Sequence, residues 1–116
     1  MDFHWDNEKL WSLVAPIEDI DVSELEWHLD VPFWSYEGGK YNLLPRIVLG
    51  DIESYPEHKE RIFNADIKYP IDIMENPKGE LVILDGMHRL LRLINEGHKK
   101  VKVRKISRDH IDKIKG

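Results

Sequence analysis

The clearest hydrophobic pattern of the chain lies between residues 80 and 97. An uninterrupted apolar run, Leu81 to Leu84, favours a short strand buried on both faces. Asp85-Gly86 follows as a turn signal. Apolar residues then recur at the i, i+3, i+4, i+7 spacing of one helix face, at Met87, Leu90, Leu91 and Ile94, and Gly97 suits a helix C-terminus. This segment therefore predicts a strand, a tight turn and a helix.

Shorter apolar segments between turn signals predict the remaining elements. We predict an N-terminal helix within residues 1–16, capped by Asp6 or Asn7, that packs on the core as a lid. The other predicted elements are a short strand from Ile17, a helical turn at 23–26, a strand or extended segment at 47–49, a helix at 54–66, strands at 71–74 and 101–106, and a short helix at 108–115. This mixture predicts an α/β domain with a small mixed sheet and packed helices.

Local signals refine three of these elements. Ser54 and Glu57 have the spacing of a capping box for the helix at 54–66, whose His58 we expect at the surface. The turn at 75–79 predicts a hairpin, which brings Asp72 and Asp85 to one end of the sheet if the register allows. The strand at 101–106 alternates apolar and basic residues, so we expect it to be half exposed and near a sheet edge.

Composition limits the class of protein. The chain has 116 residues and no cysteine, which excludes disulfides, a thiol nucleophile and a cysteine-based zinc site. No apolar run approaches the ~20 residues of a transmembrane helix, and the N-terminus lacks signal-peptide features. We therefore expect one cytoplasmic domain over residues 1–116, with an N-terminal helix (1–16), a core (17–106) and a C-terminal helix (107–116).

Charge is distributed unevenly along the chain. The net charge is −5, yet residues 86–116 carry 10 basic and 3 acidic side chains. The overall sign argues against direct DNA binding, although the basic third could form a local patch. The alternative is that acidic and basic parts face each other or solvent.

The predicted turn combines groups that bind anions. The first N–H groups of a helix lack intrahelical partners and carry partial positive charge. Gly86 allows close approach to the backbone, Arg89 offers a planar fork, and His88 can donate or accept a hydrogen bond. Together they predict a pocket for phosphate. The alternative is purely structural: Asp85 caps the helix and Arg89 pairs with a nearby carboxylate.

The motif Asp85-Gly86-Met87-His88-Arg89, with the leucine-rich helix, Gly97 and a closing basic strand, resembles the ParB/sulfiredoxin-like superfamily. The segment Tyr69-Pro70-Ile71-Asp72-Ile73 also resembles the strand that precedes this motif, and the resemblance covers residues 17–106. In relatives this turn binds nucleotide phosphates: CTP in ParB proteins, ATP in sulfiredoxin and ADP in free-serine kinases. The resemblance implies phosphate contacts from Gly86, Met87, His88 and Arg89, and Asp85 matches the functional aspartate of the serine kinases.

Sequence differences from known members of the family exclude some of the family's activities for this chain. Met87 stands where sulfiredoxin has its catalytic cysteine, so sulfiredoxin chemistry is excluded. ParB proteins have Glu-Arg-Arg or a close variant where this chain has Met-His-Arg. Partition ParB proteins also carry a helix-turn-helix domain after this region, for which we see no room before Gly116. We therefore do not expect a partition role for this chain.

A second pair of candidates lies upstream, in Trp27-His28-Leu29-Asp30. By resemblance, His28 matches a histidine near the phosphate turn, and Asp30 lies one place later than the carboxylate base of the serine kinases. A carboxylate beside a bound phosphate can take a proton from a hydroxyl or hold Mg²⁺. The alternatives are a buried, hydrogen-bonded imidazole for His28 and a turn cap for Asp30.

We therefore predict a nucleotide- or phosphate-binding domain that could act as a small-molecule phosphotransferase. Its candidate catalytic residues are Asp85, His28 and Asp30, and its expected ligand is ATP, ADP or CTP with Mg²⁺. One alternative is a non-catalytic nucleotide-sensing or protein-interaction module. Another is a metal-dependent nuclease using His28, Asp30, Asp85 and His88, although no local metal motif is present. The sequence leaves open whether copies of the chain assemble into a homo-oligomer.

Overall fold

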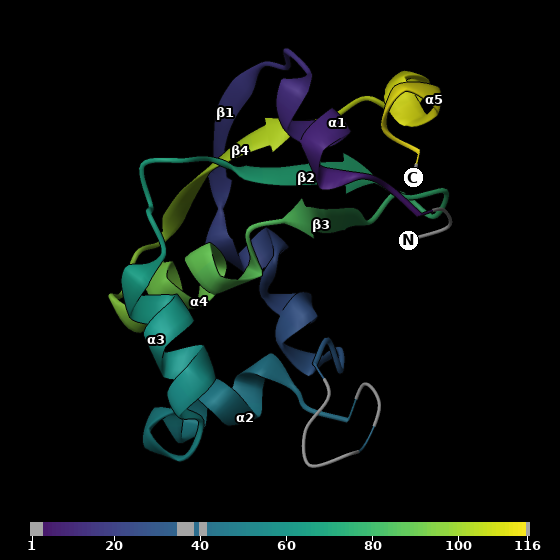
Figure 1. Cartoon of the computed structure of the whole chain (residues 1–116). Helices are drawn as coiled ribbons and strands as arrows, with labels where there is room; N and C mark the ends of the chain where they lie inside the picture. The colour runs from purple at the N-terminus through teal and green to yellow at the C-terminus, as the bar shows by residue number, and fades with distance from the viewer. Residues whose placement is uncertain (1–3, 35–38, 40–41, 116) are drawn as a thin grey trace.

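The computed structural model describes residues 4–34, 39 and 42–115. Its centre is a four-stranded mixed sheet in the order β1-β4-β2-β3 (Figure 1), made by β1 (Ile17–Asp21), β2 (Ile71–Glu75), β3 (Leu81–Asp85) and β4 (Lys100–Lys105). β4 runs antiparallel to β1 and parallel to β2, and β2 pairs with β3 as an antiparallel hairpin. The predicted mixed α/β class is confirmed.

The helices are shorter than the sequence predicted. They are α1 (Asn7–Ser12), α2 (Pro45–Gly50), α3 (Pro56–Asn64), α4 (Met87–Asn95) and α5 (Ile111–Ile114), with 3₁₀ turns at Val22–Glu24, Glu26–Asp30, Ile52–Ser54 and Arg108–His110. None of these described helices combines the length and apolar character needed to cross a bilayer.

Three local predictions were wrong. Residues 47–49 lie in α2, because Pro45 begins a helix there. Ser54 does not cap α3: its hydroxyl donates to Asp51 (2.7 Å), and the helix begins at Pro56. β4 lies inside the sheet between β1 and β2 and not near an edge, although its half-exposed character is confirmed, because Val101 and Val103 are buried and Lys100 and Lys102 are exposed.

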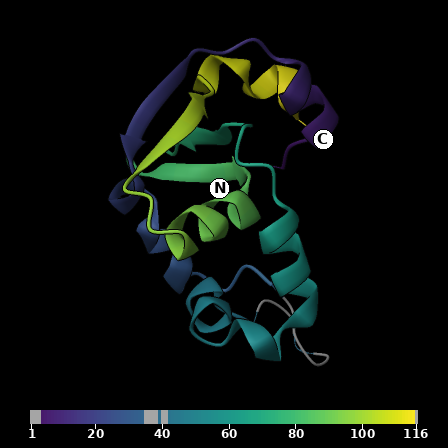
Figure 2. The same ribbon diagram turned by 90° about the vertical axis from the view of Figure 1, so that its left-hand side faces the viewer.

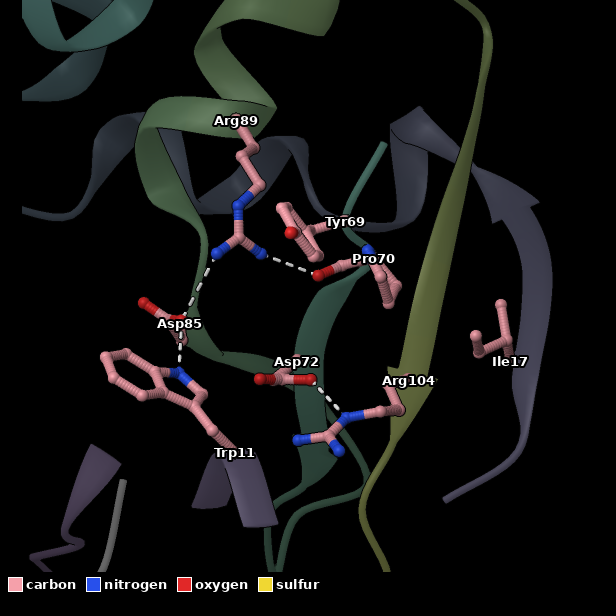
Figure 3. Close-up of a pocket in the computed structure, with 8 residues that line it drawn as sticks. All are labelled: Trp11, Ile17, Tyr69, Pro70, Asp72, Asp85, Arg89 and Arg104. Atoms are coloured by element: carbon pink, nitrogen blue, oxygen red, sulfur yellow. Dashed lines mark hydrogen bonds and ion pairs between the residues drawn. The ribbon is translucent and has the colours of Figure 1, made fainter. Parts of the chain in front are cut away.

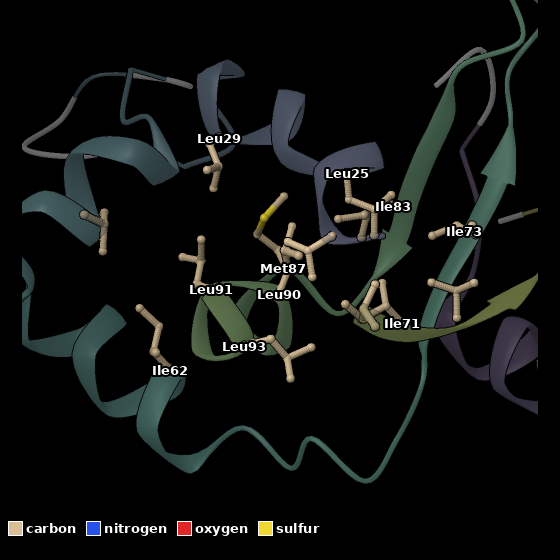
Figure 4. Close-up of a cluster of buried hydrophobic side chains, with 14 of the residues drawn as sticks. Leu25, Leu29, Ile62, Ile71, Ile73, Ile83, Met87, Leu90, Leu91 and Leu93 are labelled. Carbon is tan, nitrogen blue, oxygen red and sulfur yellow. The ribbon is translucent and has the colours of Figure 1, made fainter. Parts of the chain in front are cut away.

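Clusters of hydrophobic side chains lie on both faces of the sheet. Figure 2 shows α4 on one side of the sheet and α1 and α5 on the other. The larger cluster lies between the sheet and α4, and α2, α3 and the 3₁₀ turns within residues 22–30 also pack against it (Figure 4). It includes Leu25, Leu29, Ile62, Ile71, Ile83, Met87, Leu90 and Leu91. The smaller cluster consists of Leu10, Met74, Leu84, Ile106 and Ile114. Ile83 and Leu84 belong to different clusters, which confirms that β3 is buried on both faces.

The β2–β3 hairpin places its two aspartates opposite each other. Asp72 pairs in register with Asp85, and a register shift follows between Asp72 and Ile73. The register that the sequence left open is thus the one that brings the two aspartates to the same end of the sheet. Both lie at the end of the sheet from which α4 departs.

Candidate functional site

The turn between β3 and α4 is built around Gly86. Its φ of 115° lies in the left-handed region, and a Cβ there would lie 3.2 Å from Cγ1 of Ile71. Glycine therefore suits this position for both conformation and space. The N-cap residue of α4 is Gly86, which has no side chain, and within the described part of the chain no hydrogen bond joins Asp85 to an amide at the start of α4, so the proposed helix cap by Asp85 is not formed. The first amide groups of α4 keep the donor capacity expected of a helix N-terminus.

Arg89 connects this turn to Pro70, in the segment that precedes β2. Its Nη1 donates to the carbonyl of Pro70 (2.6 Å), and its Nη2 lies 3.4 Å from Oδ2 of Asp85. The same carboxylate oxygen accepts a hydrogen bond from Nε1 of Trp11 in α1 (2.8 Å). Figure 3 shows these three side chains converging. The carboxylate partner expected for Arg89 in the structural alternative is thus Asp85.

His88 belongs to a stack of three rings. Its Nε2 lies 3.1 Å from Nδ1 of His58, and the Trp34 ring stacks on both imidazoles, with centroid distances of 4.0 Å to His58 and 4.9 Å to His88. Burial lowers the pKa of His88 to about 4, assisted by His58 and Arg61. His88 is therefore neutral near pH 7. The expectation that His58 lies at the surface was wrong, because it is half-buried against His88.

A cavity of about 630 Å³ opens over this turn, and we call it the turn cavity. The predicted residues Asp85, Gly86, Met87, His88 and Arg89 all line it. Its remaining lining residues are Trp5, Phe33, Trp34, Arg61, Asn64, Ala65, Ile83 and Leu84. The structure thus brings the predicted binding residues together around one space.

Arg61 and Asn64 are lining residues that the sequence analysis missed. Both come from the C-terminal half of α3, which packs beside α4. Their i, i+3 spacing places them near one another on the helix surface. Nothing local to that segment, however, indicates that this surface faces residues 85–89.

A second cavity of about 510 Å³, which we call the hairpin cavity, lies on the other side of Asp85 and Arg89. These two residues line both cavities; Trp11, Ile17, Tyr69, Pro70, Asp72 and Arg104 complete this one (Figure 3). Asp72 is buried, and one of its oxygens accepts from Nε of Arg104 (2.6 Å). Burial raises the pKa of Asp72, although Arg104 acts in the opposite direction.

His28 is not brought to the turn. It is fully buried, its Nε2 accepts from the backbone N–H of Ile83 (3.0 Å), and its Nδ1 lies 2.9 Å from the carbonyl of Leu25. Because the first contact requires an unprotonated Nε2, Nδ1 carries the proton and donates to Leu25. Burial lowers the pKa of His28, which keeps it neutral. Its surroundings match the buried imidazole that the sequence left open, and it lines neither cavity.

Asp30 also lies apart from the turn. Its carboxylate is exposed and accepts two hydrogen bonds from Arg46, at 2.7 and 2.9 Å. These hydrogen bonds hold the pKa of Asp30 below its usual range. Asp30 is not a lining residue of either cavity. Of the three predicted catalytic residues, only Asp85 is placed where a ligand at the turn would contact it.

No group of three or more His, Asp or Glu side chains that could hold a metal ion occurs within residues 4–34, 39 and 42–115. Glu37-Gly38-Gly39-Lys40 predicts a turn in a loop that could cover a ligand, but most of this segment lies outside the described residues. Comparisons with family models, curated proteins and solved structures found no match to this chain. The function is therefore inferred from the residues of the site itself.

Proposed function

We propose that the turn cavity binds a phosphate-bearing ligand and that a nucleotide is the class that fits it best. The main support is one observation: the uncapped start of α4 opens into a cavity that is also lined by Arg61 and Arg89. Helix amides supply directed donors and partial positive charge, and guanidinium groups match phosphate oxygens. The two arginines and Asp85 leave the charged lining net positive, since His88 is neutral.

The aromatic side of the cavity supports the choice of a nucleotide over inorganic phosphate. Trp34 stacks with His58 and His88 and gives the cavity a flat wall on which a base could stack. Its volume lies within the roughly 300–1,000 Å³ of small-molecule sites. The strand–glycine turn–helix unit and the Asp-Gly-x-His-Arg motif also support our proposal of a ParB/sulfiredoxin-like fold.

If the site is catalytic, phosphoryl transfer is the reaction that it suits. That reaction depends on positioning and on stabilising charge, with little covalent chemistry by the protein. Asp85 would orient an acceptor hydroxyl or hold Mg²⁺, while Arg61, Arg89 and the α4 amides would neutralise the phosphoryl oxygens. In this version His28 and Asp30 have no catalytic role.

A specific observation favours the second candidate, binding without turnover. Asp85 is already engaged by Trp11 and Arg89, and it is the only carboxylate among the described residues lining the turn cavity. A nucleotide could therefore alter the contacts of α1 without reacting. The nuclease alternative stays a hypothesis, and the described residues supply no ligand cluster in its favour.

Ligand-dependent thermal stability tests the proposal. We would heat the full chain with ATP, ADP, CTP or inorganic phosphate, with and without Mg²⁺. A ligand at ~100 times its dissociation constant adds ~2.7 kcal/mol to the free energy of unfolding. We expect a nucleotide to stabilise the wild type and to stabilise Arg61→Ala and Arg89→Ala much less.

Arg46→Ala is the matched control, because Arg46 lines neither cavity and pairs with the exposed Asp30. It should retain the full ligand effect. Release of ADP from ATP, lost in Asp85→Asn, would separate an enzyme from a binding module. Absence of stabilisation by every ligand would contradict the proposed site.

A further inference from the structure

The hairpin cavity presents two aromatic rings above two carboxylates. Trp11 and Tyr69 are 56% and 63% exposed, yet both line this one cavity. Figure 3 shows Asp72 and Asp85 between the two arginines, and the β2–β3 register places the two aspartates opposite each other. Asp72 itself is only 4% exposed. The cavity thus has an accessible aromatic rim and two carboxylates at its floor.

The hydrogen bonds already formed show which polar groups of this cavity are engaged by the protein. All three guanidinium nitrogens of Arg104 donate, to Asp72 Oδ1 and to the carbonyls of Leu10 and Leu13. Both terminal nitrogens of Arg89 donate to protein oxygens as well. In contrast, Oδ2 of Asp72 and Oδ1 of Asp85 have no hydrogen-bonding partner among the described residues. Each arginine keeps further N–H groups, but the cavity also offers a ligand these two uncommitted carboxylate oxygens, one of them on the buried Asp72.

We propose that the hairpin cavity binds a small organic ammonium compound. Its ammonium group would donate to the two uncommitted carboxylate oxygens, and its apolar part would lie against Trp11 and Tyr69. Aromatic faces attract cations, so the aromatic rim and the two carboxylates both favour a cationic ligand. An alcohol of the same shape could donate a hydrogen bond but would lack the charge, and a carboxylate in the same position would place its oxygens against those of the two aspartates.

This inference does not depend on phosphate binding. Trp11, Tyr69 and Asp72 line only the hairpin cavity, whereas Arg61 lines only the turn cavity. The two sites can therefore be tested separately, although Asp85 and Arg89 lie between them.

A matched series of three probes tests the charge requirement. We would titrate ¹⁵N-labelled full chain with benzylamine, benzyl alcohol or benzoate and follow the indole N–H of Trp11, identified among four tryptophans by Trp11→Phe. Benzylamine should shift this resonance saturably, with an affinity for the alcohol at least about tenfold lower, which corresponds to ~1.4 kcal/mol. Benzoate should cause no saturable shift.

Variants then locate the probe. Tyr69→Ala and Asp85→Asn should each weaken benzylamine binding several-fold, and Arg61→Ala should leave it unchanged. The remaining resonances of each spectrum show whether the variant is folded. Equal responses to all three probes, no response to benzylamine, or an unchanged affinity in folded Tyr69→Ala would overturn the proposal. If benzylamine binds and nucleotides do not, this inference stands and the proposed phosphate site fails.

Discussion

His88 belongs to the strand–turn–helix unit and His28 packs against it, and their surroundings give them different roles. Both nitrogens of His28 are occupied by backbone groups in the core, one of them from Ile83 in β3. His88 has one nitrogen against His58 and lines the turn cavity. A buried imidazole whose two nitrogens are both satisfied contributes to stability, whereas one at a cavity wall can contact a ligand.

We predict that His28→Ala lowers the free energy of unfolding by about 3 kcal/mol, because it leaves the Ile83 N–H and the Leu25 carbonyl unpaired in the core. Urea denaturation measures this difference. Asp30→Ala, the control from the same segment, should have little effect because its partner Arg46 is also exposed. A similar small effect in both variants would show that His28 is not a structural residue.

The sequence could suggest both roles for His28 but could not choose between them. The deciding partner, Ile83, is 55 residues away along the chain. The same limit applies to Arg61 and Asn64, whose place in the turn cavity depends on how α3 packs against α4. In contrast, Asp85 to Arg89 are contiguous, and their shared location follows from one local turn.

At the scale of elements, the unit β3–Gly86–α4 is well predicted because its signals are local and agree with each other. A buried apolar run, a glycine with positive φ and a helical apolar face occur in immediate succession. α2 was missed because the short apolar run at residues 47–49 fits a strand as well as it fits a helix. The position of β4 inside the sheet depends on its pairing with β1 and β2, which alternation alone does not reveal.

We expect Gly86→Ala to destabilise this unit by about 1–2 kcal/mol, the usual cost of a left-handed conformation for a residue with a Cβ. The contact with Ile71 at 3.2 Å adds to that cost. Gly50→Ala is the matched control, since a Cβ at Gly50 would meet no atom within 4 Å. Thermal or urea denaturation of both variants measures the difference, and equal stabilities would contradict the described turn.

At the scale of the whole molecule, α1 is attached to the sheet by polar contacts on either side of the hairpin cavity. Arg104 of β4 donates to the carbonyls of Leu10 and Leu13, and Trp11 donates to Asp85. The N-terminal helix therefore contacts the turn, in agreement with its predicted packing on the core. A ligand that moves Asp85 would also change the environment of α1.

Three histidines with lowered pKa make stability depend on pH. Burial lowers the pKa of His28, His58 and His88, the last from 6.5 to about 4. At a pH between the folded and the unfolded pKa of such a histidine, the unfolded chain binds more protons than the folded chain. The free energy of unfolding therefore decreases as the pH falls, by up to ~1.4 kcal/mol per pH unit and group.

We predict that the wild type loses more stability than His88→Gln between about pH 7 and about pH 5, as measured by urea denaturation. The difference between the two proteins isolates His88, because Asp72, whose raised pKa acts in the opposite direction, is present in both. Equal losses would mean that His88 titrates normally in the folded protein.

The most direct test of the central claim is an ADP titration of the ¹⁵N-labelled chain, with and without Mg²⁺, followed at the backbone amides of Gly86, Met87 and His88. Phosphate bound at the start of α4 should cause saturable shifts that are largest at these amides, and Arg61→Ala should weaken them while Arg46→Ala does not. Shifts confined to the basic strand at 100–105, or no saturable shifts at all, would contradict a phosphate site at this turn.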